Sequence, residues 1–199
     1  MNRNKRTYFY LAVHVLSLFL LVSTVIFILN NIKYFDEIMG NYRTKLSVLS
    51  STFSEEIKTV IIAPISEEVI FREWIYNFLK KRTKFYNIIQ AFLFGLFHFL
   101  LVQSIYAFIS GIFLGNVKRK TDSLETVIFC HSFYNLLGSL YVKIIYYYLG
   151  YIYYYPIELI VKKFLHTENF IVMAIVLSIL PIIGFIWSWK KLGRDLYKL

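Results

Sequence analysis

The sequence predicts an all-α protein, a polytopic membrane helix bundle of about six transmembrane helices with both termini in the cytoplasm. Three observations support this fold class. Of the 199 residues, 58% are hydrophobic and only 17% are charged, an apolar share above that of soluble domains. The apolar residues form runs long enough for membrane-spanning helices. Short basic clusters separate the runs, as in proteins whose loops orient them in a bilayer.

The apolar runs define the expected spans, because about 20 apolar residues cross roughly 30 Å of hydrocarbon. The spans cover residues 8–29, 57–79, 85–102, 104–117, 124–149 and 170–189. The first follows MNRNKR and lacks a small-residue cleavage site, so we expect it to be retained and not removed as a signal peptide. The fourth is short and contains G-x-x-x-G at Gly111 and Gly115, which favours close packing inside a bundle.

The basic residues predict the orientation of these spans. With the N-terminus inside, the segments NRNKR, KKRTK, KRKTD and KKLGRDLYKL are cytoplasmic and hold 14 Lys and Arg, whereas the outer loops 30–56 and 150–169 hold five. This asymmetry is typical of cytoplasmic loops. The net charge of +10 is therefore interpreted as a topology signal, and no nucleic-acid partner is expected.

The stretch PISEEVIFREW places charged residues inside the second expected span. Glu67, Glu68 and Arg72 would each cost about 2.5–3.5 kcal/mol at the bilayer centre if unpaired. Glu68 and Arg72 are four residues apart in the order that favours an ion pair on a helix. Glu67 lies about 100° around the helix and needs a different neighbour.

Polar groups in two later spans are candidates for that neighbour. His98 lies in the third span, and His131 and Asn135 lie four apart on one face of the fifth. Counted from the basic clusters at about 1.5 Å per residue, these groups and Glu67 all lie about 16–22 Å above the cytoplasmic edge. A single such group usually makes an interhelical hydrogen bond, but four at a common depth predict a functional site.

The residue types in this site are those needed to hydrolyse an amide. A carboxylate and an imidazole can hold and deprotonate a water molecule, while a second imidazole and an amide can stabilise the oxyanion that forms. The sequence contains no competing G-x-S-x-G or H-E-x-x-H motif.

These residues resemble the motifs of the CPBP family of intramembrane proteases. The family comprises CAAX proteases and bacteriocin-processing or Abi proteins, and it includes Rce1-like prenyl-protein endopeptidases. The resemblance covers about residues 60–140. Its three motifs are E-E-x-x-x-R at Glu67, Glu68 and Arg72, F-x-x-x-H at Phe94 and His98, and H-x-x-x-N at His131 and Asn135.

The resemblance implies a catalytic role for four of these residues. Glu67 would act as general base on a water molecule that His98 also holds. His131 and Asn135 would form the oxyanion hole.

The remaining motif residues would support them. The resemblance implies that Glu68 and Arg72 form an ion pair beside the site and that Phe94 helps to wall it. The cofactor is either absent or one divalent metal such as zinc, for which Glu67, His98 and His131 are possible ligands. The metal-free mechanism is narrowly favoured.

The expected organisation is a single integral membrane domain over residues 1–199. Residues 1–55 would hold the first span and an outer loop, 56–150 the CPBP-like catalytic core, and 151–199 an outer loop and the last span. The resemblance implies a hydrolase, an intramembrane endopeptidase of the metallo- or glutamate-type. It would be a multi-pass protein of the cell membrane, in a prokaryote the plasma membrane. Its expected partners are membrane lipid and a peptide or membrane-anchored protein substrate.

Two alternatives stay open from the sequence. The first is a non-enzymatic membrane protein of the same fold, such as a bacteriocin immunity protein or a scaffold. The second is a proton-coupled transporter, which can also use buried Glu and His. A transporter predicts inverted repeats and interrupted helices in both halves, and the sequence shows none.

Overall fold

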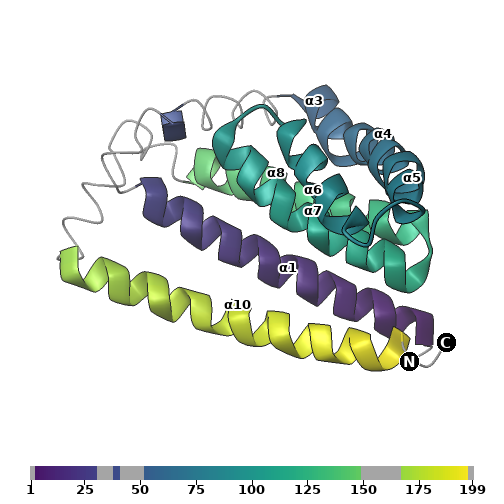
Figure 1. The fold of residues 1–199 in the computed structure, drawn as a ribbon. Helices are drawn as coiled ribbons and strands as arrows, with labels where there is room; N and C mark the ends of the chain where they lie inside the picture. Colours follow the sequence, from purple (N-terminus) through teal and green to yellow (C-terminus); the bar gives the residue numbers. More distant parts are fainter. Residues whose placement is uncertain (1–2, 31–37, 41–51, 149–166, 197–199) are drawn as a thin grey trace. The chain divides into compact units, whose positions relative to one another are not determined.

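A computed structural model of the chain describes residues 3–30, 38–40, 52–148 and 167–196. Within these ranges the chain forms helices joined by turns and no strand, which confirms the all-α prediction (Figure 1). The α-helices are α1 (Arg3–Asn30), α3 (Phe53–Ile57), α4 (Ala63–Glu68), α5 (Tyr76–Lys80), α6 (Tyr86–Leu96), α7 (Leu101–Thr121), α8 (Leu124–Tyr148) and α10 (Thr167–Leu196). The π-helical segments are η2 (Lys58–Ile62) and η3 (Val69–Ile75).

The chain divides into two compact units. The first comprises Met1–Glu37 and Leu137–Asp195, and the second comprises Ile38–Leu136 and Leu196–Leu199. Helix α8 therefore contributes to both units. The single domain expected over residues 1–199 stays a prediction.

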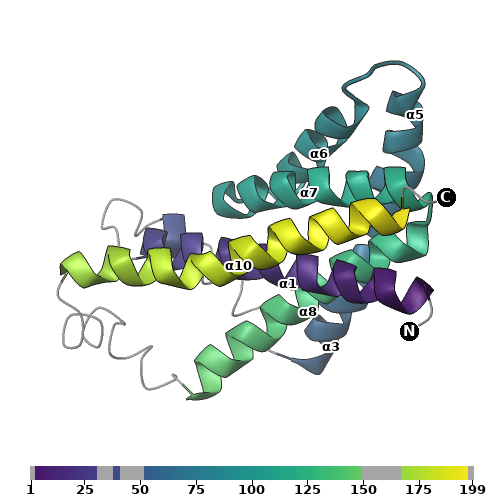
Figure 2. The same ribbon diagram turned by 90° about the horizontal axis from the view of Figure 1, so that it is seen from below.

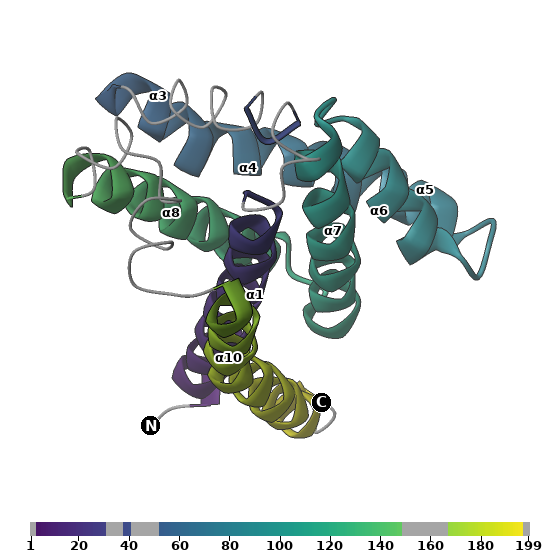
Figure 3. The ribbon, with the colours of Figure 1, turned by 90° about the vertical axis from the view of Figure 1, so that its left-hand side faces the viewer.

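In the first unit, α1 and α10 lie side by side and run in opposite directions, as Figures 1 to 3 all show. A buried polar pair joins them, because His14 Nδ1 lies 2.9 Å from Ser188 Oγ. The Ser188 hydroxyl itself donates to the Phe185 carbonyl at 3.0 Å. The imidazole must therefore donate to the hydroxyl oxygen, which satisfies a histidine nitrogen buried among apolar side chains.

In the second unit, residues 53–80 form one helical run in which α and π turns alternate (Figure 3). The expected span 57–79 lies inside this run. The π turn η2 immediately precedes α4, whose second residue is Pro64. A proline inside a helix lacks an N–H and clashes with the carbonyl of the preceding turn, and a wider turn relieves that clash.

Helices α6 and α7 form an antiparallel hairpin (Figure 2). At one end, the Asn87 amide donates to the Ile112 carbonyl at 3.1 Å. Toward the other end, a Cβ on Gly95 would lie only 2.7 Å from the Ser104 carbonyl oxygen, so the backbones almost touch. The hairpin therefore brings the basic clusters 80–84 and 118–120 to the same end of this unit.

The turn between α6 and α7 corrects the expected third span. That span was predicted to continue as a helix to residue 102, but α6 ends at Leu96 and α7 begins at Leu101. The Phe94 carbonyl, which a continuing helix would pair with the His98 N–H, lies instead 2.8 Å from the His98 ring, and the N–H donates to Gly95 O. Phe99 then adopts a φ of 60° while Leu100 N–H donates to His98 O at 2.8 Å, a strained turn for a residue other than glycine.

Two helical segments in the described part of the chain are long and apolar enough to cross a membrane, namely Lys5–Ile26 and Leu101–Thr121. Helix α6 has 11 residues and is about 16 Å long, roughly half the thickness of a hydrocarbon core. The six-span topology and the cytoplasmic termini stay predictions. Most of the outer loops 30–56 and 150–169 lies outside the described residues.

Candidate active site

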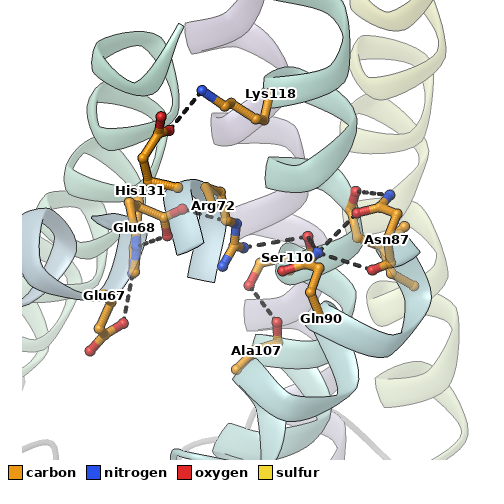
Figure 4. Close-up of polar contacts among 12 residues, drawn as sticks. Glu67, Glu68, Arg72, Asn87, Gln90, Ala107, Ser110, Lys118 and His131 are labelled. Carbon is orange, nitrogen blue, oxygen red and sulfur yellow. Dashed lines mark hydrogen bonds and ion pairs between the residues drawn. The ribbon is translucent and has the colours of Figure 1, made fainter. Parts of the chain in front are cut away.

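The structure brings Glu67 together with both candidate histidines. Glu67 lies in the last turn of α4, His98 lies in the turn after α6, and His131 lies on α8. Glu67 Oε2 is 4.0 Å from His98 Nε2 and 3.8 Å from His131 Nε2; the second pair is drawn in Figure 4. These separations are longer than direct hydrogen bonds and suit a bridging water molecule. The three side chains keep 18%, 12% and 8% of their surface exposed, so the group is enclosed but reachable.

Hydrogen bonds at the far side of each ring fix how both imidazoles are oriented. His98 Nδ1 lies 2.8 Å from the Phe94 carbonyl oxygen, and His131 Nδ1 lies 2.7 Å from Glu68 Oε1. A carbonyl or carboxylate oxygen only accepts, so both Nδ1 atoms carry a proton. In the neutral rings, both Nε2 atoms then present a lone pair toward Glu67.

Glu68 connects the ion pair to the site. Its Oε2 lies 2.9 Å from Arg72 Nε, and its Oε1 accepts from His131. Glu68 and Arg72 are both fully buried. The expected Glu68–Arg72 pair is therefore present in the structure, and the sequence did not predict its link to His131. The carboxylate uses both of its oxygens, which a buried charge requires.

Phe94 lies at the centre of these groups. Its ring centroid is 4.9 Å from that of His98 and 5.7 Å from that of His131, and the Arg72 guanidinium carbon lies 4.5 Å from it. The expected wall residue thus packs against the ion pair and both imidazoles. The contact with Arg72 adds cation–π attraction.

Asn135 is four residues beyond His131 on α8, as expected, but its amide is already engaged. Asn135 Nδ2 donates to the Thr59 carbonyl of η2 at 2.9 Å. The amide is therefore anchored to the helical run that carries Glu67. Its role in an oxyanion hole stays a prediction.

A cluster of amides lies between α6 and α7 and was not predicted from the sequence. Gln90 Nε2 donates to the Gly111 carbonyl at 3.0 Å, and Arg72 Nη2 reaches the same oxygen at 3.4 Å (Figure 4). Asn87 lies beside Gln90 and contacts Asn116 Oδ1 at 3.3 Å. The signal that identified Asn135, a polar residue inside an apolar run, was also present at these positions. The amide cluster therefore contacts the same Gly111 carbonyl oxygen that Arg72 contacts.

The three possible metal ligands have donor chemistry that fits a zinc ion. Both histidines give their Nδ1–H to an oxygen and turn Nε2 to the carboxylate, which is the arrangement seen around metal-bound histidine. Within the part of the chain that the structure describes, however, no three His, Cys, Asp or Glu side chains already form a metal-binding group. Glu67 Oε2 would have to move closer to both Nε2 atoms than 4.0 and 3.8 Å, because ligand atoms about 2.0–2.2 Å from a tetrahedral zinc ion lie roughly 3.4 Å apart.

Comparison with known families identifies the segment that carries this site. Residues 51–137 match the family model described as type II CAAX prenyl endopeptidase Rce1-like. The matched segment contains all seven motif residues. No curated protein and no solved structure matches the chain. The match confirms the resemblance that the three motifs suggested.

Proposed function

We propose that this chain, which belongs to the Rce1-like CAAX protease family through residues 51–137, is an intramembrane endopeptidase. It hydrolyses a peptide bond in a membrane-associated peptide or a membrane-anchored protein. The observation that carries the proposal is the position of Glu67 Oε2, within 4.0 Å of one imidazole nitrogen and 3.8 Å of another. A carboxylate so placed can hold and deprotonate a single water molecule.

In the proposed reaction, Glu67 takes a proton from a water molecule that His98 Nε2 also holds. The hydroxide oxygen attacks the scissile carbonyl carbon and a tetrahedral oxyanion forms. The C–N bond then breaks, and the proton passes from Glu67 to the departing amine. The short distances from Glu67 Oε2 to the two Nε2 atoms support a reaction that rests on orientation and on electrostatic stabilisation.

To serve in the proposed oxyanion hole, His131 must carry a proton on both ring nitrogens. Because its Nδ1–H is bound to Glu68, the ring can donate to an oxyanion from Nε2 only as an imidazolium. Glu67, Glu68 and Arg72 leave one negative charge in excess, and a single imidazolium balances it. The second donor would be the Asn135 amide.

The metal-free route is the one we propose, with zinc as the alternative. If a divalent ion is bound, Glu67, His98 and His131 would hold it, and it would supply a Lewis acid that polarises the carbonyl. The two routes differ in their response to metal. In the metal-free route, purified protein keeps its activity after treatment with a strong chelator and shows no stoichiometric zinc by elemental analysis.

The proposed substrates meet the site within a membrane. The matching family is described as a type II CAAX prenyl endopeptidase, so a farnesylated CAAX peptide and its unprenylated form are the first probes. We place the chain in the cell membrane as a multi-pass protein with lipid as its surroundings, and in a prokaryote this is the plasma membrane.

The test is the substitution Glu67→Gln, with Glu125→Gln as a matched control at an exposed glutamate on α8. Membranes carrying each variant are compared by peptidomics, and the purified proteins are assayed on both CAAX peptides. We expect Glu67→Gln to lower cleavage by at least about 10²-fold and the control to leave it unchanged. Equal peptide profiles for the wild type and Glu67→Gln would instead favour an immunity or scaffold protein.

A further inference from the structure

Pro64 and the π turn before it leave one backbone carbonyl without a partner in its own helix. In η2, the N–H of Ala63 donates to Lys58 O, a π-type bond across five residues. The Thr59 carbonyl would next pair with the N–H of residue 63 in an α register or of residue 64 in a π register. The first of these N–H groups is already used, and the second does not exist because residue 64 is proline.

A side chain from α8 fills this vacancy. Asn135 Nδ2 donates to Thr59 O at 2.9 Å, across 76 residues of sequence. Both ends of the bond are partly buried, where an unmatched carbonyl is costly. Pro64 itself is almost completely buried. Each feature explains the next. Pro64 favours the π turn, the π turn leaves the Thr59 carbonyl without a donor in its own helix, and that carbonyl accepts from the Asn135 amide.

We propose that Pro64 and the Thr59 carbonyl position Asn135 for catalysis. An amide nitrogen has two N–H groups. One is fixed on Thr59 O, which sets the plane of the amide and leaves the second to donate to the oxyanion. Pro64 is then a positioning residue that acts through Asn135. This inference rests on the proposed protease function.

The substitution Pro64→Ala tests the idea because it restores an N–H. With alanine at position 64, the Thr59 carbonyl gains an intrahelical donor in the π register, and relaxation to an α register gives it the N–H of Ala63. In either case the Thr59 carbonyl no longer needs Asn135 as its hydrogen-bond donor. Pro181, which lies inside α10, supplies the matched control Pro181→Ala.

The experiment is a double-mutant cycle on the full chain, reconstituted in lipid and assayed on whichever peptide shows Glu67-dependent cleavage. We expect Asn135→Ala to lower kcat by about 10²-fold or more, and Pro64→Ala to lower kcat by about tenfold with little change in KM. In the Asn135→Ala background, Pro64→Ala should change kcat less than twofold. Equal fold-losses in both backgrounds would overturn the proposal, because Pro64 would then act through Glu67 or through folding.

A second measurement does not depend on turnover. The side-chain amide resonances of Asn135 are assigned by NMR in detergent through their absence in Asn135→Ala. They should shift in Pro64→Ala and stay in place in Pro181→Ala. Unchanged resonances in Pro64→Ala would overturn the inference even if the protease activity is real. A shift without any Glu67-dependent cleavage would uphold the contact and reject the proposed function.

Discussion

At the scale of single residues, Glu68 is the group on which the site's charge balance depends. One oxygen binds Arg72 at 2.9 Å and the other accepts from His131 at 2.7 Å. A substitution of Arg72 is therefore expected to affect the His131 ring, because both side chains contact the Glu68 carboxylate. The guanidinium also rests on Phe94 and on the Gly111 carbonyl.

The substitution Arg72→Met tests this dependence. It leaves a fully buried carboxylate without its counter-ion, which typically costs about 3–5 kcal/mol in the free energy of unfolding. Thermal or chemical unfolding in detergent measures the loss. Arg82→Met is the control, because Arg82 is exposed and lies over Phe78. The double variant Glu68→Gln, Arg72→Met should lose less than the two single losses added together. An Arg72→Met variant with the same free energy of unfolding as the wild type would contradict the importance of the Glu68–Arg72 pair.

At the scale of helices, the G-x-x-x-G sequence of α7 does more than bring two backbones close. A Cβ on Gly115 would collide with the amide of Asn87 and would lie 2.8 Å from Gln90 Nε2. The missing side chain therefore makes room for the amides of α6. These amides reach the carbonyls of Gly111 and Ile112, so the glycine allows the polar contacts that fasten the hairpin.

Replacing this glycine should loosen the hairpin. Gly115→Ala is expected to lower the free energy of unfolding by about 1–3 kcal/mol, because the amides must move. Gly138 on α8 is the matched control, since nothing lies within 4 Å of a Cβ added there. Gly138→Ala should be neutral or stabilising by up to about 1 kcal/mol. The midpoint of thermal unfolding, followed by tryptophan fluorescence, distinguishes the two. Equal effects of the two substitutions would reject this account of Gly115.

The sequence predicted the helices well and their irregularities poorly. Long apolar runs located α1 and α7, and polar residues inside such runs located Glu67, His98 and His131. The strained turn at Phe99, next to the ring–carbonyl contact of His98, was not predicted. Apolar periodicity carries no information about such a contact, nor about the hydrogen-bond register that makes η2 a π turn. The catalytic roles of these residues stay predictions.

At the scale of the whole molecule, the topology is the first property to test. The hairpin α6–α7 brings the clusters 80–84 and 118–120 to one end of its unit, as the expected cytoplasmic loops require. Single cysteines at Lys81 and Arg119, both exposed, are introduced into a Cys130→Ala background. A membrane-impermeant maleimide should label both from the cytoplasmic side of inverted vesicles and neither from intact cells. Labelling from opposite sides would contradict the six-span topology.

The short length of α6 has a consequence for the substrates of the proposed protease. In the predicted topology the basic end of α6 lies at the cytoplasmic face, and its 11 residues would place the His98 turn about 16 Å into the membrane, near the middle of the hydrocarbon layer. A peptide that is helical at that depth has its carbonyl groups already hydrogen-bonded within the helix, which shields them from attack. If the proposed cleavage takes place at that depth, it requires a segment that unfolds from a helix at low cost, and glycine, serine or asparagine beside the cleaved bond should distinguish good substrates from resistant ones.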